Sequence, residues 1–73
     1  MNLPEMFPVN SSNVSSVGYD AENELVYVSF NDASLYVYKG VSQQEFENLR
    51  DAPSVGSHLH RNFKNVYPYE RIG

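Results

Sequence analysis

Two histidines, His58 and His60, stand two residues apart and are the first side chains that could do chemistry. A pair of metal ligands on a helix needs a spacing of four, whereas a spacing of two suits one face of a strand. The chain has no cysteine, and no third ligand accompanies the histidines. Serines and acids occur without the local frame of an activated nucleophile, and no glycine-rich phosphate loop is present. We therefore expect no metal site, no cofactor and no enzymatic activity.

The C-terminal stretch combines cations with tyrosines, a pairing that suits RNA. Cations can contact phosphates, and tyrosine rings can stack on unpaired bases. The candidate binding residues are Arg61, Lys64, Tyr67, Tyr69 and Arg71. Alternatively, the two tyrosines dock on the edge of the sheet or of a helix, and the cations are solvated or pair with acids.

Charge is unevenly distributed along the chain. The net charge is −4, which argues against a protein that holds nucleic acid by bulk attraction. Before His58 the only cations are Lys39 and Arg50, against eight acids, whereas the remainder has three cations against Glu70. We expect an acidic body with a mildly basic C-terminal end.

Alternating apolar residues predict three strands that would position these side chains. The strands cover residues 14–20, 24–30 and 35–39, and turn-forming residues fill the two short gaps between them. Connections this short join neighbouring antiparallel strands. On the third strand either Tyr36 with Tyr38, or Leu35 with Val37, shares the core face with Val26 and Val28. Tyrosines at this spacing could fill the core or stack on bases, and periodicity leaves both open.

Helical signals begin after Gly40. Ser42 and Glu45 form a capping-box pattern ahead of an apolar stripe, and Pro53 ends this helix. Ser54 is a second cap for a short helix. The segment around Pro68 is predicted to be extended.

The expected domain is therefore α+β, a three-stranded antiparallel meander packed on one or two short helices in the order β-β-β-α-α. We expect residues 1–10, with two prolines, to be a flexible N-terminal lead and residues 11–73 to form a single domain. The absence of cysteine, of a signal-peptide pattern and of a long apolar run predicts a cytoplasmic protein with no membrane partner.

Four stretches of the chain resemble the KTSC domain, a short domain at the C-terminus of some lysyl-tRNA synthetases and in free-standing small bacterial or phage-type proteins. They are SSNVSSVGYD, the central YVY, DAPSVGS and the close HRNFKNVYPYERI, and together they span roughly residues 9 to 72. RNA binding is conjectured for this family from its company with a synthetase. The resemblance thus favours an uncharacterised binding module for structured or tRNA-like RNA. The alternative is a module for protein interaction or self-association through the sheet face or edge.

The family's motif positions fall on Tyr19, Tyr36, Tyr38 and Gly56, which the resemblance implies are core or functional residues. Where the family has a Ser-Lys-Gly turn, this chain has Val55 in place of the lysine. That departure removes a cation from the turn where a phosphate contact is easiest to imagine.

Overall fold

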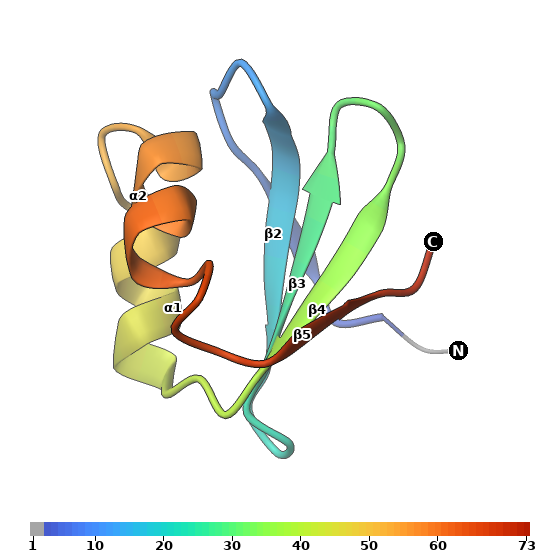
Figure 1. The fold of residues 1–73 in the computed structure, drawn as a ribbon, viewed down its shortest axis with the longest axis vertical. Helices are drawn as coiled ribbons and strands as arrows, with labels where there is room; N and C mark the ends of the chain where they lie inside the picture. The colour runs from blue at the N-terminus through green and yellow to red at the C-terminus, as the bar shows by residue number, and fades with distance from the viewer. Residues whose placement is uncertain (1–2) are drawn as a thin grey trace.

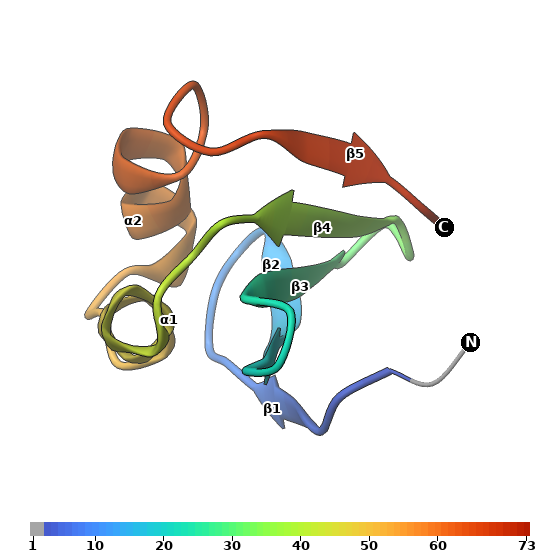
Figure 2. The ribbon, with the colours of Figure 1, turned by 90° about the horizontal axis from the view of Figure 1, so that it is seen from below.

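The computed structural model describes residues 3–73 as an antiparallel five-stranded sheet with two helices on one side of it (Figures 1 and 2). The strand order in the sheet follows the chain, β1-β2-β3-β4-β5. The elements are β1 (Met6–Pro8), β2 (Val14–Asp20), β3 (Leu25–Phe30), β4 (Leu35–Lys39), α1 (Gln43–Arg50), α2 (Val55–Asn62) and β5 (Tyr69–Arg71). The α+β class, the antiparallel sheet and the two helices are confirmed. The expected order β-β-β-α-α is wrong, because a short strand is added at each edge of the sheet.

Strand register settles which tyrosines face the helices. Val26 lies opposite Tyr38 and Val28 lies opposite Tyr36, and directly opposed residues project from the same face of a sheet. Tyr38 belongs to the buried core, with only 6% of its surface exposed, whereas Tyr36 is only partly buried. The two rings therefore share a face but differ in their surroundings.

The buried core lies between that face and the helices. It consists of Val14, Val17, Val26, Val28, Tyr38, Val41, Phe46, Leu49, Val55, Leu59 and Phe63. Each aliphatic or aromatic side chain buried in this way contributes about 1.5–3 kcal/mol to folding. With no cysteine in the chain, this packing has no disulfide to assist it.

The first edge strand lies within the expected N-terminal lead. Residues 6–8 form β1, in which Met6 lies opposite Gly18 and Pro8 opposite Ser16. Proline is tolerated at such an edge, where its missing N–H can face away from the neighbouring strand. Residues 1 and 2 of the lead lie outside the described residues.

The second edge strand, β5, shows where the C-terminal stretch lies in the fold. In β5, Tyr69 lies opposite Tyr38 and Arg71 opposite Tyr36 of β4. The Lys39 N–H donates to the carbonyl of Pro68 over 2.9 Å, which extends the ladder by one bond. The stretch therefore docks on the sheet edge, and this docking brings Tyr69 beside the tyrosines of β4.

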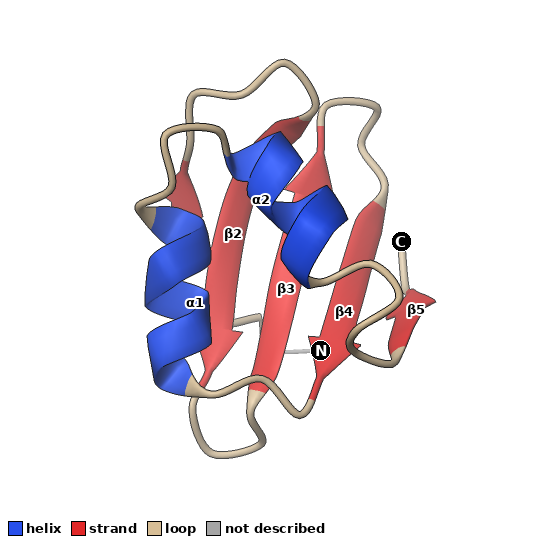
Figure 3. Cartoon of the chain, turned by 60° about the vertical axis from the view of Figure 1, so that its left-hand side comes forward, coloured by secondary structure: helices blue, strands red, loops and turns tan. Residues whose placement is uncertain are grey.

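Both helices begin at the predicted serine caps. Ser42 Oγ accepts from the Glu45 N–H, and Ser54 Oγ accepts from the Ser57 N–H. Figure 3 shows α1 beside β2 and α2 crossing the middle of the sheet, so that neither helix lies over β5 or most of β4. Among residues 3–73, no helix is long and apolar enough to span a membrane.

Candidate functional site

An open groove of about 660 Å³ lies between α2 and the part of the sheet that no helix covers. Pockets that bind small ligands typically measure roughly 300–1,000 Å³. The groove is lined by Ser12, Asn13, Val14, Phe30, Asn31, Asp32, Ser34, Tyr36, Tyr38, Gly56, Leu59, His60, Lys64 and Tyr69. Its residues come from the loop before β2 and the start of that strand, the end of β3 and the turn after it, strands β4 and β5, and α2 with its C-terminal turn.

Aromatic rings line the sheet side of the groove. Tyr36 meets Phe30 edge to face, with ring centroids 5.4 Å apart. The Tyr69 ring lies 5.4 Å from that of Tyr38 and 6.1 Å from that of Tyr36. Tyr69 is half exposed, so a flat ligand can reach its ring. This arrangement is suited to stacking.

The three tyrosine hydroxyls of the groove are available to a ligand or to water. Among the described residues, Tyr36, Tyr38 and Tyr69 donate no hydrogen bond from their hydroxyls to the protein. The pKa of Tyr38 is raised, first by burial and then by the neighbouring phenols of Tyr69 and Tyr36. Tyr38 therefore stays protonated at neutral pH and can donate a hydrogen bond into the groove.

Lys64 and Asp32 set the charge of the groove's rim. Within residues 3–73, the Lys64 ammonium forms no salt bridge, which leaves it free for an anion. Asp32 accepts hydrogen bonds from the hydroxyl of Ser34 over 2.6 Å and from its N–H over 3.0 Å. These bonds, the hydroxyl's first, hold the pKa of Asp32 below its usual range, so its carboxylate is ionised at neutral pH.

A second, more polar depression of about 520 Å³ lies at the start of α2. It is lined by Asn10, Ser11, Ser12, Asn13, Pro53, Ser54, Gly56, Ser57, His60 and Arg61. A Cβ on Gly56 would lie 3.3 Å from Ser11 Oγ, so the glycine allows the loop to approach the helix closely. This close approach of the loop to the helix is a structural reason for a glycine at the family-motif position Gly56.

The structure brings together only some of the residues that were predicted to bind RNA. Lys64 and Tyr69 both line the groove, and Arg61 lines the second depression. Tyr67 lines neither, because its ring packs 5.1 Å from the core ring of Phe63. Arg71 also lines neither, and its Nε donates to the Gly73 carbonyl over 2.9 Å.

Two family-motif tyrosines have structural contacts. Tyr19 donates its hydroxyl to the carbonyl of Val41 over 2.7 Å and stacks on Phe46 with centroids 5.1 Å apart. Tyr38 meets Phe63 edge to face in the core. Tyr36, in contrast, lies partly exposed between Phe30 and Tyr69 in the groove.

Sequence reasoning missed several groove residues, two of which lie in turns. Asn13, Phe30, Asn31 and His60 were not candidates for binding, yet all four line the groove. Asn31 Nδ2 donates to the carbonyl of Ser12 over 2.9 Å, which ties the two turns together. No local pattern in the sequence marks a contact between turns this far apart in the chain.

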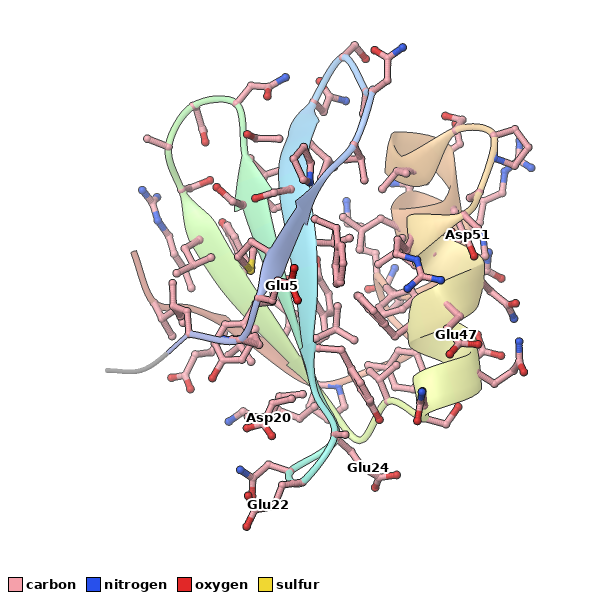
Figure 4. The ribbon with its side chains drawn as sticks, turned by 180° about the vertical axis from the view of Figure 1, so that it is seen from behind. Glu5, Asp20, Glu22, Glu24, Glu47 and Asp51 are labelled. Atoms are coloured by element: carbon pink, nitrogen blue, oxygen red, sulfur yellow. The ribbon has the colours of Figure 1, made fainter. Side chains whose placement is uncertain are left out.

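Most acids lie away from the groove. Figure 4, the view from behind, shows carboxylates near β1, at the β2–β3 turn and along α1. The labelled residues are Glu5, Asp20, Glu22, Glu24, Glu47 and Asp51. Of the nine acids in the chain, Asp32 alone lines the groove. Among the described residues, no three His, Asp or Glu side chains gather in a way that could hold a metal ion.

Comparisons with known proteins give the family of the chain. The KTSC domain model matches residues 10–67. An uncharacterised protein of Stutzerimonas stutzeri strain A1501 is 37% identical over 65 residues, which cover 88% of this chain and 92% of that protein. A protein of Tsukamurella paurometabola is 33% identical over 51 residues, covering 70% of this chain and 76% of that one.

A solved structure agrees with this assignment. The crystal structure of a KTSC domain protein from Yersinia pestis superposes with a TM-score of 0.89 at 30% sequence identity. The match covers 94% of this chain and 97% of the Yersinia chain. The resemblance that was drawn from the sequence is confirmed, and the chain belongs to the KTSC domain family.

Proposed function

We propose that this domain is a non-enzymatic RNA-binding module that holds unpaired nucleotides in the groove beside α2. The observation that carries the proposal is the half-exposed ring of Tyr69 next to Tyr36, with the unpaired ammonium of Lys64 on the same groove. Sequence-specific RNA recognition targets unpaired bases, which can stack on aromatic side chains. Loops of structured or tRNA-like RNA present such bases.

The energies involved are sufficient for weak binding of unpaired nucleotides. Stacking of one base on an aromatic side chain contributes about 1–3 kcal/mol. The cations near the groove add attraction for phosphate, and most of the carboxylates lie elsewhere on the molecule. The proposed role needs no bulk positive charge, because contacts at one groove and not the net charge provide the affinity.

A residue-resolved NMR titration tests this proposal. The labelled protein is titrated with a single-stranded RNA and with tRNA, at roughly 0.05 M and then roughly 0.15 M salt. We expect saturable shifts on Tyr36, Lys64 and Tyr69 that survive the higher salt. The variants Tyr69→Phe, which keeps the ring, and Tyr69→Ser, which removes it, form a matched pair. Stacking predicts that only the serine variant loses affinity, and shifts that are diffuse or absent would refute RNA binding in the groove.

The exposed edge of β5 favours a second candidate function, self-association or binding of another protein. All three residues of β5 are exposed, and the apolar residue Val66 just before it is 59% exposed. An open strand edge can pair with another chain through its backbone. Such association would be nearly independent of salt, unlike RNA binding. Analytical ultracentrifugation over a range of protein concentrations, with Val66→Ser as the variant, tests this alternative.

A further inference from the structure

We propose that the groove and the polar depression form one continuous channel along α2 that binds a single-stranded RNA segment of at least two nucleotides. This inference rests on the proposed function and specifies its ligand. The two hollows share four lining residues, namely Ser12, Asn13, Gly56 and His60. The two hollows therefore adjoin, and a strand long enough to occupy both crosses these shared residues.

The walls of the channel are held by contacts within the protein. Asn31 Nδ2 donates to the Ser12 carbonyl, which fixes the turn after β3 against the loop before β2. On the other side, Gly56 has no side chain, so the loop before β2 packs against α2. A Cβ at this position would lie 3.3 Å from Ser11 Oγ. A larger residue at position 56 would push this loop away from α2 and change the surface where the two hollows adjoin.

The two ends of the channel differ in chemistry. Tyrosine and phenylalanine rings line the groove, whereas serine and asparagine side chains dominate the second depression and no tyrosine or phenylalanine lines it. Bases suit the aromatic end, because every base has a face that can stack. Phosphate and ribose hydroxyls suit the polar end, since hydroxyl, amide and guanidinium groups can all hydrogen-bond to them.

Each end has its own cation. Lys64 lies on the groove and Arg61 on the polar depression. The N–H groups of Phe63 and Lys64 both donate to the Leu59 carbonyl, so the winding of α2 continues to Lys64. The two cations are therefore three residues apart on one helical path and can contact successive phosphates of one strand. A mononucleotide has only one phosphate position and cannot use both.

Binding of uridine nucleotides of increasing length tests the channel. The probes are uridine 5′-monophosphate, a diuridylate and a tetrauridylate, whose affinities are measured by NMR titration at roughly 0.05 M salt. We expect the tetrauridylate to bind at least about tenfold more tightly than the mononucleotide, since it adds one phosphate contact and further hydrogen bonds. The Arg61→Gln variant should lose affinity for the tetrauridylate and keep its affinity for the mononucleotide.

The salt dependence gives a second readout. Each phosphate neutralised on a single strand contributes about −0.7 to the slope of log K against log salt concentration. Arg61→Gln should therefore make the tetrauridylate slope shallower by about 0.7. Lys39→Gln is the matched control, because Lys39 lies on the other face of the sheet and pairs with Glu70 over 3.3 Å. Lys39→Gln should change neither the affinity for the mononucleotide nor that for the tetrauridylate.

The possible failures are distinguishable. Equal affinity for the mononucleotide and the tetrauridylate, with Tyr69→Ser still weakening both, overturns the channel and leaves RNA binding in the groove intact. The same conclusion follows if Arg61→Gln binds the tetrauridylate as tightly as the unchanged protein. Binding of none of the three probes, nor of tRNA, overturns the proposed function and the channel together.

Discussion

Truncation of Tyr38 is expected to remove a large part of the domain's stability. Tyr38 is 6% exposed and packs against Phe63 with ring centroids 5.6 Å apart. Replacing a buried aromatic residue by alanine typically costs about 3–5 kcal/mol. A domain of 73 residues has a free energy of unfolding of roughly 4–11 kcal/mol at roughly 0.05–0.15 kcal/mol per residue. Tyr38→Ala should therefore leave the domain marginally folded or unfolded at room temperature.

Urea denaturation measures this loss, and two variants serve as controls. Tyr38→Phe removes only a hydroxyl that makes no hydrogen bond to another described residue, so we expect a change within about 1 kcal/mol. Tyr36→Ala should cost less than Tyr38→Ala, about 1–2 kcal/mol, because Tyr36 is only partly buried. A loss below about 1.5 kcal/mol for Tyr38→Ala, or equal losses for the two alanine variants, would refute the assignment of one ring to the core and the other to the groove.

Three further predictions follow from other contacts. Gly18→Ala should cost about 1–3 kcal/mol in thermal or urea unfolding, because its Cβ would lie 2.7 Å from the backbone oxygen of Glu5 and must displace β1; an equally stable variant would contradict this. Asp32→Asn should raise RNA affinity about threefold, since a unit charge roughly 6 Å from a phosphate contributes about 0.7 kcal/mol in water; an unchanged dissociation constant at low salt would be the contrary result. Burial raises the pKa of both Tyr19 and Tyr38 above 10.0; the carboxylates of Glu24 and Asp20 add to this at Tyr19, and the neighbouring phenols of Tyr69 and Tyr36 add to it at Tyr38. As pH rises past about 10, the unfolded chain loses these protons before the folded one, so stability falls; equal free energies of unfolding at about pH 8 and about pH 11 would contradict this prediction.

The central elements of the fold could be predicted because their signals are local. The strands from Val14 to Lys39 alternate between two faces, and the caps Ser42 and Ser54 lie directly ahead of their helices. The edge strands β1 and β5 have three residues each, too few for a period to emerge. They form because β2 and β4 offer free backbone groups, and this partnership is set by the tertiary fold.

The residues of the candidate groove were predictable only as residue types. Tyr69 and Lys64 were candidates by composition, and the pairing of β5 with β4 is what places them together. The same types at Tyr67 and Arg71 do not line the groove, because one ring packs on the core and the other side chain bonds to the C-terminal backbone. Asn13 lines the groove through a contact between turns, which no spacing rule in the sequence encodes.

Net charge was the least informative part of the sequence for judging RNA binding. The molecule measures 28 × 23 × 21 Å, while charges are screened over about 8 Å at physiological ionic strength. Acids at the β2–β3 turn and on the outer side of α1 therefore act mainly on their own surroundings. What a phosphate meets along the groove and the adjoining depression is decided by Lys64, Arg61 and Asp32, which are two cations and one carboxylate. An acidic protein of this size can thus present a locally basic site, provided that folding gathers its few cations beside one helix.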